Sequence, residues 1–275
     1  MSNEMEGGNM KKSKGFTLIE LLVVIAIIAL LMAILMPALQ RVKKQAKAVV
    51  CESNLHQWSL IFSMYTSDND NRFGIGWTGA DIGISGHRWV KTLKPYYRDK
   101  DICFCPAATK FFSEGGRGSL AAWGGGWDQD WGAEKGQYGG SYGLNEFVSN
   151  PPPGVTLDWR EAVTRHWRTP DVRGTNNIPL FLGCWLAGGY PFDTDNPPEY
   201  DGEVRWGDEI IRYCVNRHDS TVNSAFLDFS VKRVGLKELW TLKWNRRFDI
   251  NGSWTKAGGV QAGDWPPWMI SFKDY

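Results

Sequence analysis

The sequence predicts an α+β protein in which one long N-terminal helix carries a small, loop-rich head built on an antiparallel sheet. Residues 21–36 are sixteen consecutive apolar residues, whereas all fifteen tryptophans lie at position 58 or beyond. This contrast divides the 275-residue chain into a helical stalk and a globular part. The hydrophobic content of 43% excludes a disordered chain, and the net charge of +1 gives no electrostatic basis for binding nucleic acid.

The apolar segment is long enough to cross a membrane. With residues 16–20 it makes a helix of about 31 Å at about 1.5 Å per residue, which matches a bilayer core. A secretory signal peptide needs a shorter apolar region and small residues at its cleavage site, which Met36-Pro37-Ala38 supplies poorly. A plain anchor leaves Glu20 unexplained, because a carboxylate inside a spanning helix is unfavourable by about 2.5 kcal/mol or more.

The residues KGFTLIE at 14–20, followed by the apolar segment, resemble the type IV prepilin class, which includes the pseudopilins of type II secretion. The resemblance implies a leader at residues 1–15, removed by a prepilin peptidase between Gly15 and Phe16, and N-methylation of Phe16. Residues 16–36 then form a transmembrane helix that becomes the filament core. Glu20, the fifth residue of the mature chain, pairs with the freed ammonium of Phe16 on a neighbouring subunit.

Residues 37–66 are expected to continue the helix as an amphipathic segment. Pro37 occupies a position where pilins commonly carry a helix-weakening proline, and by itself it removes one backbone donor and kinks the helix. Four basic residues lie between the apolar positions and therefore face solvent or lipid headgroups: Arg41, Lys43, Lys44 and Lys47. The Asp- and Asn-rich segment 66–71 ends the helix near Tyr65.

The head, residues 67–275, shares short elements with the pilin-like proteins abundant in planctomycetes. The resemblance rests on residues 51–73, Cys105-Pro106, residues 141–145, and His218 followed ten positions later by Asp228. That family has glycine after the aspartate, where this chain has Phe229, and a phenylalanine does not easily adopt positive φ. We expect His218 and Asp228 to share a structural hydrogen bond across a terminal hairpin.

Four segments are predicted to be strands of the head: 178–182, 210–215, 222–227 and 230–234. The last two form an antiparallel hairpin around residues 228–229. Residues 236–244 are expected to form a short amphipathic helix. The sheet then packs on the second half of the long helix.

Five cysteines follow the proposed cut, in a head expected outside the cytoplasm, where disulfides persist. We expect Cys51 to pair with Cys105 and Cys184 with Cys214, which leaves Cys103 over. Free buried thiols are one alternative. A zinc site at Cys103 and Cys105 is another, although their spacing is one residue and no second pair matches it.

No cofactor is firmly indicated, and catalysis is not expected. The histidines His56, His87, His166 and His218 accompany no nucleophile elbow, phosphate loop or paired-histidine motif. Calcium is the one candidate ion, because Asp193, Asp195 and Asp201 crowd a proline-rich loop and major pseudopilins carry a calcium site in the head. Residues 68–71 are a weaker candidate, since an Asx-rich turn explains them.

The resemblance implies a structural, non-enzymatic filament subunit, of a type IV pilus or of a type II secretion pseudopilus. Its partners are other copies, related pilins, the prepilin peptidase and an inner-membrane assembly platform. It is a single-pass inner-membrane protein with the head outside the cytoplasm, later a periplasmic or surface filament. The alternative is a membrane-anchored surface protein whose tryptophans, such as Trp123, Trp127 and Trp131, bind polysaccharide. An exposed aromatic face favours binding, and scattered buried tryptophans favour a scaffold.

Overall fold

The computed structural model describes residues 17–76, 89–124, 139–152 and 163–275, and divides into two compact units, residues 1–44 and 45–275. Helix α1 (Leu18–Asp68) runs from the first unit into the second without interruption at Pro37. It ends three residues beyond the predicted Tyr65. Asp70 and Asn71 follow with φ of 54° and 55°, and this left-handed backbone cannot continue a right-handed helix.

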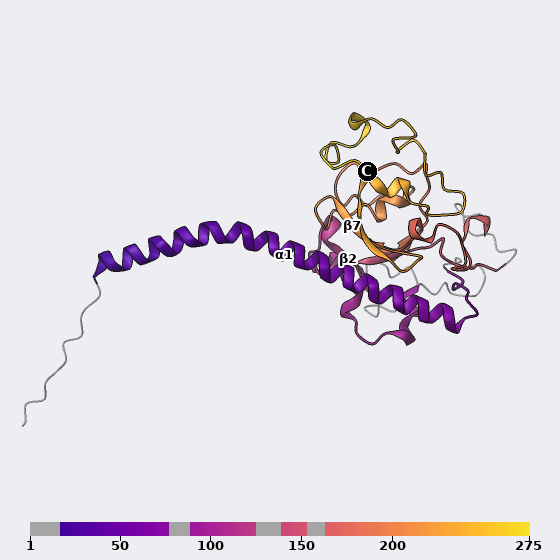
Figure 1. The fold of residues 1–275 in the computed structure, drawn as a ribbon, viewed down its shortest axis with the longest axis horizontal. Helices are drawn as coiled ribbons and strands as arrows, with labels where there is room; N and C mark the ends of the chain where they lie inside the picture. The colour runs from indigo at the N-terminus through magenta and orange to yellow at the C-terminus, as the bar shows by residue number, and fades with distance from the viewer. Residues whose placement is uncertain (1–16, 77–88, 125–138, 153–162) are drawn as a thin grey trace, which may run out of the picture. The chain divides into compact units, whose positions relative to one another are not determined.

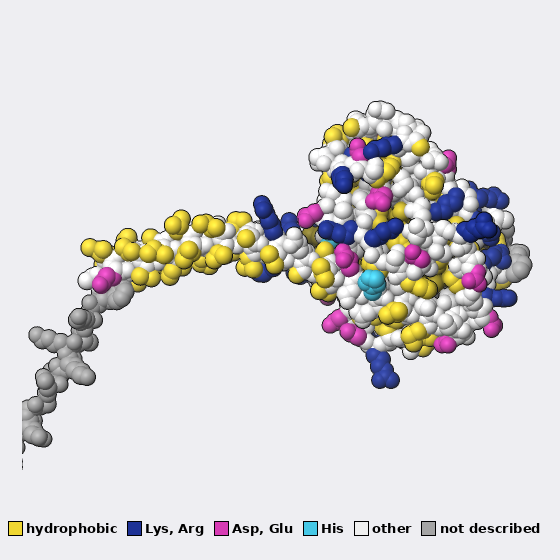
Figure 2. All heavy atoms as spheres, viewed as in Figure 1, with side chains coloured by type: hydrophobic (Ala, Val, Ile, Leu, Met, Phe, Trp, Pro, Cys, Tyr) yellow, Lys and Arg dark blue, Asp and Glu magenta, His cyan; other side chains and the backbone are white. Residues whose placement is uncertain are grey.

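Within the described residues, α1 is the one helix long and apolar enough to cross a membrane by length and composition. None of its most apolar stretch is buried in the structure. In Figure 2, apolar side chains cover the visible face of this stretch, and Lys and Arg side chains follow it. A helix that is apolar on all sides needs lipid or other helices around it.

The main sheet of the head has five strands in the order β6-β4-β5-β7-β8. They are β4 (Tyr142–Asn145), β5 (Pro179–Gly183), β6 (Gly188–Gly189), β7 (Thr221–Phe226) and β8 (Val231–Gly235). All pairs are antiparallel except β4 with β6, which is parallel. The α+β class, the strand at 178–182 and the terminal hairpin are therefore confirmed, while the sheet is mixed rather than purely antiparallel.

A second sheet consists of β1 (Lys110–Phe111), β2 (Ala121–Gly124) and β3 (Gly139–Gly140), with β1 parallel to β2. The sequence did not predict these strands, nor β4 and β6, because they are short and all of them except β1 contain glycine. Gly143 in β4 has a clear physical reason. A Cβ there would lie 2.8 Å from the Cβ and Sγ atoms of Cys184 on the neighbouring chain segment.

Two predicted elements differ from the structure. The prediction of a strand at 210–215 is wrong, because residues Glu209–Arg212 form a 3₁₀ helix, η9. Asp195 directs this turn by accepting hydrogen bonds from the backbone N–H groups of Glu209 and Ile210. The helix predicted at 236–244 is a shorter 3₁₀ helix, η10 (Lys237–Thr241).

The main sheet has a core on each face, since alternate residues of a strand point to opposite sides. On β7, Ala225 belongs to the core that contains the last part of α1, whereas Val222 and Phe226 belong to the core of the C-terminal segment. Figure 1 shows the end of α1 beside the strands of the head. Four residues of α1 at helical spacing form this contact: Cys51, Leu55, Trp58 and Phe62.

Aromatic contacts fix the helix against the head. The Trp58 ring packs edge-on against Trp89 at 4.8 Å and lies 5.8 Å from Phe181 of β5. Its indole N–H donates to the Ile102 carbonyl at 2.8 Å. The second part of α1 is therefore an integral element of the head.

Candidate functional site

The N-terminal end of α1 is closed by a capping box formed by Thr17 and Glu20. The Glu20 carboxylate accepts hydrogen bonds from the Thr17 backbone N–H at 2.9 Å and from its hydroxyl at 2.8 Å. In return, the Glu20 N–H donates to the Thr17 hydroxyl at 3.3 Å. This reciprocal pattern satisfies donors that every helix start leaves free. Glu20 therefore has a partner within its own chain, and its carboxylate is otherwise exposed.

The sequence carried the signal for this cap. Thr17-x-x-Glu20 directly before an apolar run is the usual capping-box pattern, a role for Glu20 besides the pairing between subunits that the resemblance implies. Gly15 and Phe16, the predicted processing residues, lie outside the described residues. The basic residues Arg41, Lys43, Lys44 and Lys47 are all exposed, as expected for positions that face solvent or headgroups.

A buried cluster joins three residues that are far apart in the sequence: Cys51, Cys105 and His218. One possible ligand atom from each lies within 4.8 Å of the other two. His218 Nε2 is 3.3 Å from the Cys105 sulfur. All three side chains are buried, with 5% or less of each residue exposed. Among the described residues, this is the one group of His, Cys, Asp or Glu whose ligand atoms converge in this way.

The cluster shifts the pKa values of its two thiols in opposite directions. Contact with Cys51, the bond to His218 and the nearby Arg217 guanidinium lower the pKa of the Cys105 thiol well below its usual range. The Cys51 thiol, which faces Cys105 and is buried, has its pKa raised. Cys105 therefore has the stronger thiolate character.

Arg217 lies beside the cluster and links several segments of the head. Its guanidinium donates to the carbonyl oxygens of four residues, and no carboxylate within the described residues forms a salt bridge with it. The acceptors are Ser119 at 2.6 Å, Ala121 at 3.0 Å, Cys184 at 2.9 Å and Ser141. No local pattern in the sequence marks Arg217, because its side chain binds backbone groups that are distant along the chain.

The expected hydrogen bond between His218 and Asp228 is not formed. The two residues flank opposite ends of the β7–β8 hairpin, in which Thr221 pairs with Gly235 at one end and Ala225 with Val231 at the other. Asp228 instead accepts from the Ser230 backbone N–H at 3.0 Å and from its hydroxyl at 2.6 Å. It therefore stabilises the turn.

Phe229 adopts a φ of 65° in this turn, the conformation that the sequence made doubtful for a phenylalanine. Its ring packs against the core that contains α1. The Asp228 turn contacts and this packing hold the residue in a backbone region that is unfavourable by about 1–3 kcal/mol for most side chains.

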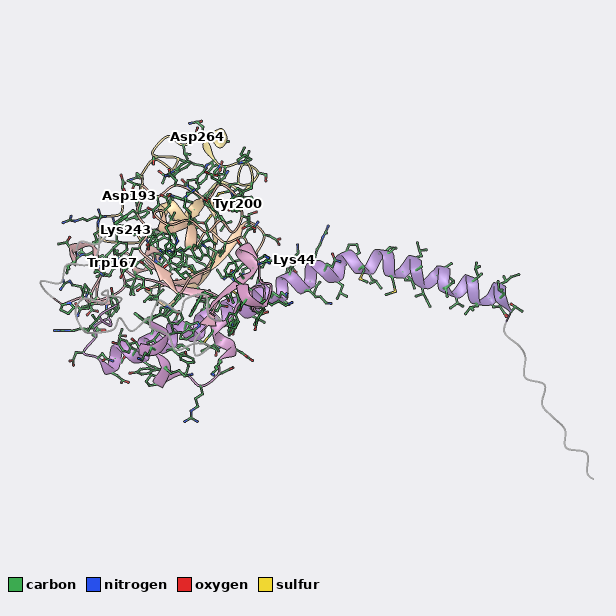
Figure 3. All side chains as sticks on the ribbon, turned by 180° about the vertical axis from the view of Figure 1, so that it is seen from behind. Lys44, Trp167, Asp193, Tyr200, Lys243 and Asp264 are labelled. Carbon is green, nitrogen blue, oxygen red and sulfur yellow. The ribbon has the colours of Figure 1, made fainter. Side chains whose placement is uncertain are left out.

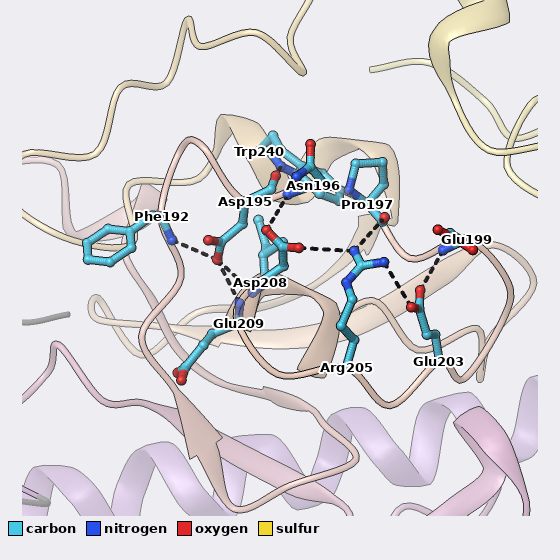
Figure 4. A network of polar contacts seen from close by, with 11 residues as sticks. Phe192, Asp195, Asn196, Pro197, Glu199, Glu203, Arg205, Asp208, Glu209 and Trp240 are labelled. Carbon is cyan, nitrogen blue, oxygen red and sulfur yellow. Dashed lines mark hydrogen bonds and ion pairs between the residues drawn. The ribbon is translucent and has the colours of Figure 1, made fainter. Parts of the chain in front are cut away.

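The candidate calcium ligands do not converge. Figure 4 shows the Asp195 carboxylate occupied by backbone N–H groups, of which Phe192 contributes one at 3.0 Å and Glu209 another at 2.8 Å. Asp201 accepts from the Ser119 hydroxyl and from the Asn216 N–H. Asp193, labelled in Figure 3, is half-buried near Arg165. Each carboxylate therefore has its own separate partners: backbone N–H groups for Asp195, Ser119 and Asn216 for Asp201, and the nearby Arg165 charge for Asp193.

The five cysteines are all buried free thiols in the structure. Cys51 and Cys105 lie together, as the predicted pairing requires, but a histidine joins them. The Cys184 sulfur accepts a hydrogen bond from the Leu186 N–H at 3.5 Å, and burial raises the pKa of its thiol to about 12. Cys103 is buried outside the cluster, and burial raises its pKa to about 11.

His166 forms a pair with Ser149 that could be mistaken for a catalytic dyad. The Ser149 hydroxyl lies 2.8 Å from His166 Nδ1, but it donates its own proton to the Glu146 carbonyl at 2.6 Å. The histidine must therefore be the donor to Ser149, which leaves no base for a serine nucleophile. His56 is exposed, and His87 lies outside the described residues.

Burial of His166 predicts a loss of stability in acid. Burial and Arg168 lower its pKa from 6.5 to about 4. The unfolded chain therefore binds a proton that the folded chain does not, and stability should fall by about 3 kcal/mol as the pH drops from 6.5 to 4. The measurement is thermal unfolding of the detergent-solubilised protein across this range. His166→Gln should show a correspondingly weaker pH dependence, and an unchanged dependence would contradict this role of His166.

Most of the described tryptophans are buried, including Trp123, whose indole N–H donates to the Tyr142 carbonyl. Trp206 is 54% exposed. Trp167, labelled in Figure 3, is buried and donates to the Trp244 carbonyl at 3.0 Å. Trp127 and Trp131 lie outside the described residues. Scattered buried indoles are the pattern expected of a scaffold rather than of a sugar-binding face.

Comparison with known proteins supports the assignment of the N-terminal segment. The family model for the prokaryotic N-terminal methylation motif matches residues 10–36. The type IV wide pilus major component PilA4 of Thermus thermophilus is 47% identical over 62 residues, which is 22% of this chain and 47% of that protein. The match thus spans about half of the relative's length. No solved structure matches the chain. The similarity to type IV pilins therefore lies in the N-terminal segment of the chain.

Proposed function

We propose that this protein is a structural subunit of a type IV pilus-like or type II secretion filament, made as a membrane precursor, cleaved after Gly15 and N-methylated at Phe16. The observation that carries the proposal is the methylation motif at residues 10–36, which includes the apolar start of α1, a stretch that none of the described residues buries. Prepilin peptidase and an inner-membrane assembly platform are the partners this pathway requires. The head lies outside the cytoplasm on a single membrane-spanning segment.

The exposed surface of α1 supports this proposal energetically. Fifteen of the nineteen residues from Leu18 to Met36 are large apolar residues that are each 45% or more exposed. Transfer of one such side chain out of water contributes about 1.5–3 kcal/mol, so the segment cannot remain in water. In the precursor, lipid surrounds it. In a filament, the helices of other copies and of related pilins replace the lipid.

The buried tryptophans support the filament subunit over a polysaccharide-binding protein. The described indoles that are fully buried contribute to the cores of the head, as Trp58, Trp185 and Trp240 do, and are not accessible to a sugar ring.

Processing at Gly15 tests the proposal. In cells that contain a prepilin peptidase, the intact mass of membrane-extracted protein should correspond to a chain that begins at methylated Phe16. Gly15→Val should leave the precursor uncut, because a branched side chain replaces the residue at the cut. Gly8→Val, the same change elsewhere in the leader, is the matched control and should be processed normally. A mature chain that begins at Ala38 would identify an ordinary secretory signal and overturn the proposal.

A further inference from the structure

We propose that Cys51, Cys105 and His218 form a binding site for a thiophilic metal ion, Zn²⁺ or Cu⁺, that fastens the last part of α1 to the head. Two thiolates and one imidazole are a donor set that these soft or borderline ions prefer. The proposal is independent of filament assembly, since all three residues lie within the compact unit 45–275.

The geometry brings the three donors together from separate parts of the fold. Cys51 is on α1, Cys105 follows the 3₁₀ helix η3 (Asp101–Cys103), and His218 precedes β7. Their ligand atoms lie within 4.8 Å of one another, a separation that a metal ion at its centre can bridge with bonds of about 2.0–2.3 Å after small shifts. The site has almost no exposure to solvent.

Surrounding residues hold the donors in place. The Cys105 N–H donates to the Ser141 hydroxyl at 2.5 Å, and the His218 carbonyl accepts from Thr221 and from Arg233. These bonds fix the backbone of Cys105 and of His218 beside the cluster. The nearby Arg217 guanidinium is bound to backbone carbonyls and favours negative charge on the Cys105 sulfur.

A buried polar atom without a hydrogen-bond partner among the described residues, Asn223 Oδ1, belongs to a side chain beside the cluster. Asn223 of β7 is fully buried, contacts the Cys51 thiol, and donates through Nδ2 to the Ala48 carbonyl at 3.0 Å. Its Oδ1 atom has no hydrogen-bond partner in the described structure. A buried carbonyl oxygen without a donor fits a site in which a metal-bound water occupies a fourth position.

A disulfide between Cys51 and Cys105 is the competing state, and the histidine argues against it. A disulfide bond does not involve a third side chain. A histidine nitrogen 3.3 Å from a cysteine sulfur, in contrast, is an arrangement in which both atoms can bind the same metal ion. Formation of the disulfide would remove two protons and two electrons from the thiols, and both sulfurs would then be lost as thiolate ligands.

The test uses the full chain, extracted in detergent, reduced and freed of metal. Zn²⁺ or Cu⁺ is then added in separate experiments. After removal of excess ion, the amount of bound metal per chain is measured by elemental mass spectrometry. The wild type should retain one ion per chain. Cys105→Ser and His218→Gln should weaken binding by on the order of a hundredfold or more. Cys103→Ser is the matched control, because it removes a nearby buried thiol outside the cluster, and it should bind as the wild type does.

A measurement on the unaltered protein covers the case in which a variant fails to fold. X-ray absorption of the Zn²⁺-loaded wild type should show two sulfur neighbours at about 2.3 Å and one nitrogen at about 2.0 Å. A shell of oxygen and nitrogen alone, or metal retained equally by Cys105→Ser, would overturn the proposal. A Cys51–Cys105 disulfide found by non-reducing peptide mapping of protein from its native host would also overturn it.

Discussion

Arg217→Lys is expected to destabilise the head by about 4 kcal/mol or more. The guanidinium reaches the carbonyl oxygens of Ser119, Ala121, Ser141 and Cys184 at once, and only 7% of Arg217 is exposed. A lysine ammonium is a compact donor that cannot span these directions. Each buried acceptor left without a partner is unfavourable by about 1–3 kcal/mol. Denaturant unfolding of the detergent-solubilised variant measures the change.

Arg233→Lys is the matched control for this prediction. Arg233 is exposed and donates to the His218 carbonyl at 3.0 Å, so the same chemical change should alter the free energy of unfolding by less than about 1 kcal/mol. Equal losses in the two variants would show that the multiple carbonyl contacts of Arg217 do not determine the stability of the head.

Glu20→Gln is expected to leave cleavage after Gly15 and membrane insertion intact but to reduce the yield of filaments sheared from cells severalfold or more. The glutamine keeps the size of the side chain and can still complete a capping box with Thr17. It removes the negative charge that would pair with the Phe16 ammonium of a neighbouring subunit. The measurement is filament yield together with the fraction of precursor processed.

Glu20→Leu separates capping from charge. It removes the charge and also the bonds that the Glu20 carboxylate accepts from Thr17, whereas the backbone N–H of residue 20 can still donate to the Thr17 hydroxyl. If only the cap matters, Glu20→Gln assembles normally and Glu20→Leu does not. If the interchain pair matters, both variants accumulate as processed monomers in the membrane. Normal filaments from both would rule out any role for Glu20 in assembly.

The sequence predicted the elements whose signal is local. The apolar run, the helical spacing from Cys51 to Phe62 and the two apolar segments around Asp228 each define an element within a few turns of chain. The predicted end of the helix lies close to the observed end for the same reason, because the Asx-rich segment supplies the residues with left-handed backbone that end it. Strand β4 was missed because Tyr142-Gly143-Leu144-Asn145 has no alternating pattern, and its glycine is explained only by the distant Cys184.

The buried cluster was beyond local prediction for a related reason. Cys51, Cys105 and His218 each stand more than fifty positions from the next, and no motif joins them. For Asp195, the neighbouring acidic residues suggested a calcium ligand. In the structure its carboxylate accepts hydrogen bonds from backbone N–H groups instead. Both sites depend on tertiary contacts that residue spacing does not record.

The attachment of α1 to the head has a mechanical consequence. Hydrogen bonds join residues 48–58 of the helix to separate head segments: Asn223 donates to the Ala48 carbonyl, Asn54 to that of Phe104, and Trp58 to that of Ile102. These bonds follow one another along the axis of the helix. A force that pulls the helix along this axis is therefore shared among them as a shear load. They must then break nearly at once, which resists tension better than bonds that open one after another. A head held in this way would stay on its helix under a load that would peel off one attached at a single point.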